Sequence, residues 1–241
     1  MSTRSFLLGL ALTANAVVAA PTPAAIEARA VIDHDAVVGF AETVPATTEG
    51  SLMLAYKPLL KVVNGCVPFP AVDADGNTSG GLDNTGDPSG DCDSSTGQVY
   101  ARAAAYEEYF AIMYSWYMPK DEPSTGLGHR HDWEEAIAWL SSDSTDATLV
   151  AFSVSAHGGI SSSTSPGLSG KQPLAQYVSY WPLDHQLDQT TTVGGTQPLI
   201  AWDSLTTAAQ DALQTTDFGS AIVPFKDSTF SANLAKGYAT L

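Results

Sequence analysis

The stretch TGLGHRHDWEE, residues 125–135, gathers several side chains that can bind a metal ion. Its last seven positions hold two histidines, an arginine, an aspartate, a tryptophan and two glutamates. Carboxylates are hard oxygen ligands and imidazole is a borderline ligand, so this set suits magnesium, calcium or manganese. The stretch is a catalytic metal site, a binding site that uses a metal, or a polar strand whose side chains hydrogen-bond each other.

Strand geometry restricts how this stretch could hold an ion. In a regular strand His129 and His131 share one face, whereas Asp132 and Glu134 share the other. Either one histidine contacts a metal ligand without binding the ion itself, or the chain enters the strand through a loop or bulge near Gly126 and Gly128.

Sequence motifs of hydrolases are missing. The chain contains no H-E-x-x-H motif, no closely spaced set of three histidines and no G-x-S-x-G elbow. The carboxylates of Asp132 and Glu134 could serve a glycosidase, but only their separation in space would identify one. Spacing alone therefore assigns no reaction.

The charge of the chain excludes two classes of partner. The 241 residues carry a formal net charge of −16, and the pI is about 4.3. Such an acidic surface repels nucleic acids and cannot dock on anionic lipid through a basic patch. It does suit divalent cations. Hydrophobic residues make up 44% of the chain, which is enough for a core.

The N-terminus predicts export. Arg4 precedes an apolar run from Phe6 to Leu12, and small residues follow, so we interpret 1–19 as a signal peptide. Residues 20–30 resemble a short propeptide, and 31–241 is expected to be one domain. No later run is long enough to span a membrane, so the mature chain is expected to be soluble and extracellular.

Cys66 and Cys92 are the only cysteines, and in an exported chain they are expected to form a disulfide. The bond would stabilise the fold by about 3–4 kcal/mol through loop closure. The alternative is two free buried thiols. The polar loop 73–97 lies mostly inside this link, and Asn77 in it begins the only N-glycosylation sequon.

The hydrophobic pattern predicts a mainly β protein. Strands dominate the middle of the chain and helices its end, which indicates a β-sandwich with flanking α-helices. In the segment 99–118 the second half, from about Phe110, predicts a strand, and for the first half a strand is favoured over a helix. Further strands are expected at 131–140, 147–157 and 176–181, a Gly/Ser loop at 158–173, and helices at 203–214, capped by Asp203 or Ser204, and 228–239.

Several segments resemble a known family. The segment AIMYSWYMPKDEPSTGLGHRHDWE (111–134) contains GHRHDWE, the central motif of the necrosis- and ethylene-inducing-peptide-like proteins of plant-associated microbes. The resemblance covers nearly all of the mature chain. Further matching segments are NGCVPFPAVDADGNTSGGL (64–82), SAHGG (155–159), QPLIAW (197–202) and FGSAIVPF (218–225).

This resemblance implies a β-sandwich similar to actinoporins and fungal lectins, and a secreted cytolysin rather than an enzyme. Such a toxin binds plant sphingolipid headgroups, the glycosyl inositol phosphorylceramides, and damages the plasma membrane. In the family an acidic cavity holds a divalent cation, usually magnesium. The positions that match its metal ligands are Asp121, His129, Asp132 and Glu134.

A second loop of the family meets the sugar, and YWPLDHQ (180–186) resembles it. The matching residues are Trp181, Asp184 and His185. Trp181 is expected to be exposed, because Pro182 and Asp184 favour a loop. Arg130 is expected to pair with carboxylates, and the other histidine of the motif to orient the metal ligands from behind.

Three alternatives remain open at this point. A non-toxic family member would act through a plant immune receptor that senses the segment 111–134. A lectin would bind sugar and leave membranes intact. A secreted hydrolase would use the same metal cavity to cleave a glycan or a lipid headgroup.

Overall fold

The computed structural model describes residues 29–241. The expected signal peptide and most of the expected propeptide therefore lie outside the described residues. Within the described part, no helix has the length and apolar character needed to cross a membrane.

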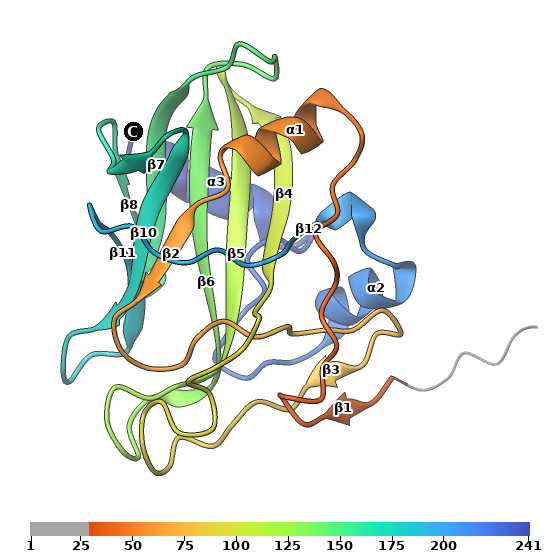
Figure 1. The fold of residues 1–241 in the computed structure, drawn as a ribbon, viewed down its shortest axis with the longest axis vertical. Coiled ribbons are helices and arrows are strands. Elements are labelled where there is room, and N and C mark those ends of the chain that lie inside the picture. Colours follow the sequence, from red (N-terminus) through yellow and green to blue (C-terminus); the bar gives the residue numbers. More distant parts are fainter. Residues whose placement is uncertain (1–28) are drawn as a thin grey trace, which may run out of the picture.

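A six-stranded sheet forms the centre of the molecule (Figure 1). Its order is β12-β4-β5-β6-β7-β8, and all neighbours are antiparallel except β12 and β4. Aromatic residues are frequent in its long central strand β5, which suits a pleated surface buried on both sides. The strands are β4 (Val99–Tyr106), β5 (Tyr109–Asp121), β6 (His129–Leu140), β7 (Leu149–Ala156), β8 (Gly159–Ser163) and β12 (Leu199–Ala201).

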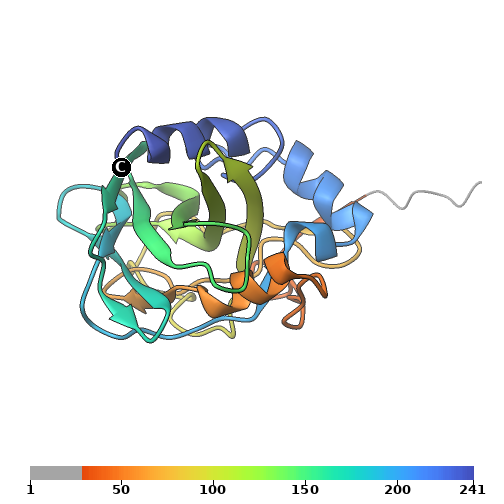
Figure 2. The same cartoon turned by 90° about the horizontal axis from the view of Figure 1, so that it is seen from above.

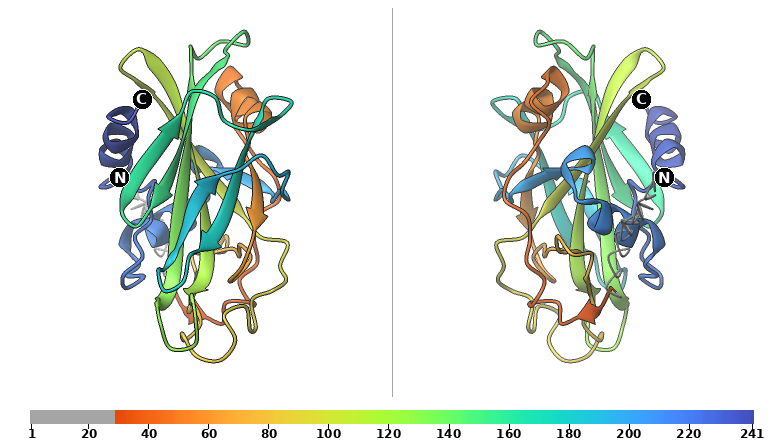
Figure 3. Two further views of the ribbon diagram at one scale, coloured as in Figure 1. Left: turned by 90° about the vertical axis from the view of Figure 1, so that its left-hand side faces the viewer. Right: turned by 90° about the vertical axis from the view of Figure 1, so that its right-hand side faces the viewer.

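A smaller sheet packs against one side of the large sheet (Figures 1 and 3). In it β10 lies between an antiparallel β11 and a parallel β2, and β9 also pairs with β10. Gln189 of β11 donates from Nε2 to the carbonyl of Phe152 in β7, which joins the two sheets. The strands are β2 (Leu59–Val62), β9 (Leu168–Ser169), β10 (Gln172–Ser179) and β11 (His185–Gln189); a separate pair consists of β1 (Val31–Ile32) and β3 (Thr78–Ser79).

Three helices flank the sheets. Seen from above, α3 (Phe230–Tyr238) covers the face of the large sheet opposite the small sheet (Figure 2). A side chain at Gly237 of α3 would collide with Ile137 and Trp139 of β6, so glycine permits this close approach. The other helices are α1 (Thr48–Ala55) and α2 (Thr207–Thr215), which follows a short 3-10 turn, η1 (Trp202–Ser204).

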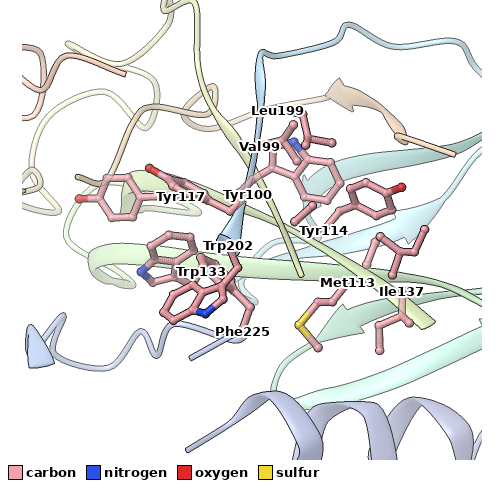
Figure 4. Close-up of a cluster of buried hydrophobic side chains, with 14 of the residues drawn as sticks. Val99, Tyr100, Met113, Tyr114, Tyr117, Trp133, Ile137, Leu199, Trp202 and Phe225 are labelled. Atoms are coloured by element: carbon pink, nitrogen blue, oxygen red, sulfur yellow. The ribbon is translucent and has the colours of Figure 1, made fainter. Parts of the chain in front are cut away.

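One continuous cluster of buried side chains extends from Leu52 to Leu234. Figure 4 shows part of it, where aromatic rings of β4, β5 and β6 meet Trp202 and Phe225. In β5 every residue from Phe110 to Asp121 is buried. The mainly β class with two packed sheets and flanking helices is confirmed. A single domain over 31–241 stays a prediction, and this continuous core supports it.

Several predictions of individual elements were wrong in detail. The expected loop 158–173 contains β8 and β9. β8 is an edge strand that is rich in serine and poor in apolar residues, so its sequence resembles that of a loop. The strand expected at 176–181 starts at Gln172 and ends at Ser179. The helix expected at 203–214 is capped by Thr206, whose hydroxyl accepts from the Ala209 N–H, because the preceding residues form η1.

The disulfide between Cys66 and Cys92 is confirmed, with 4.9 Å between the two Cα atoms. It anchors the polar loop that precedes β4. In this loop the carbonyl of Asp87 accepts a hydrogen bond from the Nζ of Lys120 in β5. Lys120 also pairs with Glu122, whose Oε1 accepts from the N–H of Gly126. Both charged side chains are buried, so this ion pair fixes the turn between β5 and β6.

Candidate functional site

A cavity of about 360 Å³ opens where β6 and β7 separate. The ladder between the two strands ends at the pair Ala136 and Val154. Beyond this pair the N–H of Glu135 donates to the Oγ of Ser155 rather than to a backbone carbonyl, at 2.9 Å. The gap in the sheet gives the cavity access to side chains on both faces of β6.

Three residues from separate segments could hold a metal ion in this cavity. Asp121 ends β5, His129 begins β6, and Asp184 lies in the turn before β11. One ligand atom from each lies within 4.8 Å of the other two. Ligand atoms that share one divalent cation, each about 2.0–2.6 Å from it, lie within about 5 Å of one another. The three side chains therefore need little adjustment to bind one ion.

The backbone at His131 explains how His129 reaches the same cavity as Asp132. His131 has φ +61°, a left-handed conformation that is rare for residues other than glycine. This interrupts the alternation of side chains along β6. His131 itself turns away and lies against Phe218, with its Nδ1 2.6 Å from the hydroxyl of Tyr117.

His131 was expected to orient Asp132 or Glu134 through its side chain, and this expectation was wrong. Its side chain makes no hydrogen bond to Asp132 or Glu134 in the described structure. Its carbonyl instead lies 2.8 Å from Nδ1 of His129, so it orients His129 through the backbone. Arg130 pairs with Asp83, as expected for a structural partner of a carboxylate.

His185 holds the carboxylate of Asp121. Its backbone N–H donates to both oxygens of Asp121, at 3.1 and 3.0 Å, and its Nδ1 lies 2.6 Å from Oδ1. Both side chains are buried. His185 is thus placed beneath the cluster, where it fixes the orientation of Asp121.

Asp132 and Glu134 line the same cavity. One oxygen of each carboxylate accepts a hydrogen bond from a neighbouring side chain. Tyr177 donates to Oδ2 of Asp132 at 2.7 Å. Ser155 donates to Oε2 of Glu134. The second oxygen of each carboxylate is left for a cation or for water bound to one.

The crowded carboxylates shift the protonation of the site. Burial raises the pKa of Asp132 to about 8, and the charge of Asp121 adds to the rise. Burial also raises the pKa of Glu134 well above its usual range, together with the charge of Asp132. Burial opposes the His129 cation, but the carbonyl of His131 and the surrounding carboxylates raise the pKa of His129 above its ordinary value. A cation among these groups would favour the ionised carboxylates.

The turn between β10 and β11 carries exposed apolar side chains next to the cluster. Trp181 is 74% exposed, which confirms the expectation for this residue, and Leu183 is 53% exposed. The turn lies at the lower end of the molecule in Figure 1, as does the loop between β5 and β6. These apolar side chains thus share a turn with Asp184 of the cluster, although neither lines the cavity.

Comparison with known proteins assigns the chain to a family. The model of the family described as "Necrosis inducing protein (NPP1)" matches residues 50–237. The chain belongs to this family. The resemblance of the segment around GHRHDWE is thereby confirmed for most of the chain.

Relatives of this NPP1 family member include effector and necrosis-inducing proteins of Phytophthora species. "NLP effector protein 1" of Phytophthora capsici is 52% identical over 217 residues, which cover 88% of this chain and 92% of the relative. "Necrosis-inducing protein NPP1" of Phytophthora nicotianae is 48% identical over 231 residues, covering 92% and 96%.

Solved structures of the NPP1 fold agree with this assignment. One, described as a toxin fold for microbial attack and plant defence, is 49% identical with a TM-score of 0.83, covering 87% of this chain and 100% of the other. NLPPya in complex with mannosamine is 50% identical with a TM-score of 0.82, covering 86% and 99%. The non-toxic HaNLP3 protein is 39% identical with a TM-score of 0.82, covering 85% and 98%.

Of the site residues expected from the sequence, six line one cavity and Trp181 does not: Asp121, His129, Asp132, Glu134, Asp184 and His185. Asp184, expected to meet a sugar, also lies close enough to Asp121 and His129 to share an ion with them, and the role of each residue stays a prediction. Tyr177 and Ser155, which orient the other two carboxylates, were missed. No sequence signal points to them, because the role of Tyr177 depends on how the two sheets pack and that of Ser155 on where β7 separates from β6.

The side chain of Asn77, which begins the sequon, makes two hydrogen bonds. Its Nδ2 donates to Oδ2 of Asp73 at 2.9 Å, and its Oδ1 accepts from the N–H of Ala30 at 3.0 Å. The amide thus links two residues of the loop and also ties the loop to the segment before β1. Glycosylation at Asn77 stays a prediction.

Proposed function

We propose that this NPP1 family member is a secreted cytolytic toxin that binds plant sphingolipid headgroups through a divalent cation. The cluster of Asp121, His129 and Asp184 beside exposed Trp181 carries this proposal. Sugar hydroxyls are hard donors that a protein-bound cation can ligate. An exposed indole supplies apolar area and a polar edge at a membrane surface.

The donor set fits magnesium, with calcium or manganese as substitutes. Asp121, His129 and Asp184 would bind the ion directly, because their ligand atoms lie close together. Magnesium keeps several of its waters in protein sites. Asp132 and Glu134 would accept hydrogen bonds from these waters with the oxygens that Tyr177 and Ser155 leave free.

The solved NLPPya complexes with mannosamine and glucosamine support a sugar ligand, since those proteins are about half identical to this chain. The proposed ligand here is the glycan headgroup of a glycosyl inositol phosphorylceramide. The protein acts by binding this headgroup and disrupting the bilayer, and not by turnover.

Dye release from vesicles that contain plant glycosyl inositol phosphorylceramide tests the proposal. Release with magnesium, stopped by a chelator, is the expected result. Asp184→Asn should abolish release while the fold survives, and Asp143→Asn, an exposed aspartate in the turn after β6, should not. Equal release by all three proteins would contradict the metal cluster.

The same assay separates the other candidates. Binding to the vesicles without release would indicate a lectin. Appearance of free headgroup with repeated turnover would indicate a hydrolase. Absence of both binding and release by the folded protein would refute the toxin proposal.

A second candidate function is recognition of the segment 111–134 by the plant immune system. The solved structure of the non-toxic HaNLP3 protein supports this alternative. A chain with this fold can thus lack toxicity. Residues 111–118 have no exposed surface here, because they form the centre of β5. A plant receptor would therefore read this segment only after the protein is unfolded or cleaved.

Leaf assays of ethylene release would test this second function. A synthetic peptide of residues 111–134 and protease-treated protein should both be active. Intact folded Asp184→Asn protein, which lacks the proposed lysis, should be inactive when applied to leaf tissue together with protease inhibitors. Equal activity of the intact variant would contradict recognition of a buried segment.

A further inference from the structure

The cavity continues past the metal cluster to the other face of β6. Asp132 and Glu134 point to the small sheet, whereas Trp133 and Glu135 are on the face covered by α3. All four line one cavity, because β7 has already separated from β6 at this level. The part of the cavity beyond β6 contains no residue of the metal cluster.

Glu135 is a buried acceptor in this second part. Its side chain is only 9% exposed, and its carboxylate accepts no hydrogen bond from another residue in the described structure. Only its backbone N–H is engaged, by Ser155. Its oxygens are not fully enclosed and the residue lines the cavity, so the carboxylate is available to a ligand there.

Trp133 supplies a buried donor. Its ring lies among aromatic neighbours, but its Nε1 has no hydrogen-bond partner within residues 29–241. The indoles of two other buried tryptophans do have partners: Trp116 donates to Gln197 and Trp139 donates to Ser153. This indole nitrogen is itself fully buried, so other atoms of the Trp133 ring line the cavity and offer it an aromatic surface.

Residues of helix α3 and of the loop before it form the remaining wall of this second part of the cavity. Lys236 of α3 lines the cavity and is its only lysine; its Nζ lies 3.4 Å from the carbonyl of Gly158. Asn233, one turn earlier, uses its Nδ2 on the carbonyl of Pro224, which leaves its Oδ1 without a partner in the structure. Ile222, 58% exposed, adds an apolar edge.

We propose that the part of the cavity lined by Trp133, Glu135 and Lys236 is a second saccharide subsite. Its carboxylate accepts from sugar hydroxyls, its ammonium donates to ring and hydroxyl oxygens, and the Trp133 ring and Ile222 cover an apolar sugar face. The inference rests on the proposed function, in which the cluster holds one sugar. The toxin would then recognise at least two linked sugars, one on each side of β6.

Isothermal titration of the magnesium-loaded protein tests this subsite. The two probes are glucosamine and the free glycan headgroup released from plant glycosyl inositol phosphorylceramide. The whole headgroup should bind the wild-type protein about tenfold more tightly than glucosamine, as expected for one or two added hydrogen bonds to charged groups. Glu135→Gln and Lys236→Met should each lose most of this gain and leave glucosamine binding unchanged.

Matched variants serve as controls. The control variants are Glu107→Gln and Lys171→Met. Glu107 is in the turn between β4 and β5, and Lys171 is in the turn before β10, both outside the cavity. Each should retain the full preference for the headgroup. Melting temperatures would verify that all variants are folded.

The outcomes separate the subsite from the function on which it rests. If the wild-type protein binds neither probe, the proposed function and the subsite both fail. If glucosamine binds and Asp184→Asn abolishes it, but Glu135→Gln and Lys236→Met keep the wild-type headgroup affinity, only the subsite is overturned. The same holds if the wild-type protein binds the headgroup no better than glucosamine.

Discussion

Tyr177 of the small sheet donates a hydrogen bond of 2.7 Å to Asp132 of the large sheet. The phenol ring of Tyr177 also stacks on the imidazole of His185, with 4.6 Å between ring centroids. His185 in turn holds the carboxylate of Asp121. One buried tyrosine therefore positions two acidic residues of the cavity from the opposite sheet.

Replacing Tyr177 by phenylalanine tests this positioning. Tyr177→Phe keeps the ring stacked on His185 but leaves Asp132 without its donor. Loss of such an outer contact weakens metal binding by roughly 10–100-fold in comparable sites. We expect a loss in this range for magnesium in titration calorimetry, with a stability cost of about 1 kcal/mol.

Tyr180→Phe is the matched control. Tyr180 donates to Asp188 at 2.7 Å, but it is 52% exposed and does not line the cavity. Magnesium affinity should be unchanged in this variant. Equal affinities in both variants would mean that Tyr177 has no part in the site.

Magnesium binding should strengthen as the pH rises. The pKa of Asp132 is about 8 in the folded chain, above its unfolded value. The folded chain thus binds an additional proton between about pH 4 and pH 8, so its stability without a cation falls as the pH rises through this range. A cation must displace this proton, so higher pH favours binding.

Thermal unfolding measures this effect directly. The increase in melting temperature caused by magnesium should be larger at about pH 8 than at about pH 5.5. Sodium chloride of equal ionic strength is the control. An increase that is independent of pH would show that Asp132 keeps no proton in the folded chain.

Trp181→Ala should separate membrane damage from folding. The side chain is 74% exposed, so its loss should leave the melting temperature within about 1 °C of wild type. Dye release should fall strongly, because the apolar projection beside the cluster is lost. Val193→Ala, at another exposed apolar residue, should not affect release. Full release by Trp181→Ala would exclude this turn from membrane contact.

Removing the disulfide should destabilise the chain. Cys66→Ser combined with Cys92→Ser should lower the free energy of unfolding by about 3–4 kcal/mol, since the closed loop is then free in the unfolded state. The same loop supplies the carbonyl of Asp87 to Lys120 next to the cavity. Denaturant titration gives the value, and an unchanged midpoint would argue against a structural role.

The sequence predicted the centre of the fold better than its edges. Aromatic and β-branched residues between Ile112 and Tyr117 identified β5, because this strand is buried on both faces. Helix α1 was missed, since its apolar residues Leu52, Met53 and Leu54 are adjacent and show no helical spacing. The polar edge strand β8 had too few apolar residues to be distinguished from a loop.

The candidate site was predicted by its motif and not by its geometry. Spacing within the motif raised the question of how His129 and Asp132 could face one ion, and the left-handed backbone at His131 answers it. No residue pattern encodes that conformation. Asp184 and Tyr177 belong to the small sheet and its turn, and their distances to the motif depend on packing between sheets.

The burial of β5 limits how far the segment 111–134 could vary. A plant sensor for the segment 111–134 would read side chains that also form the interior of the protein, such as Trp116 and Met118. A large-to-small change at such a position costs about 2–5 kcal/mol, which is a large share of the stability of an ordinary domain. Mutations in the segment would therefore also threaten the protein's ability to fold, so a plant sensor of this segment would monitor a part of the chain that can hardly vary.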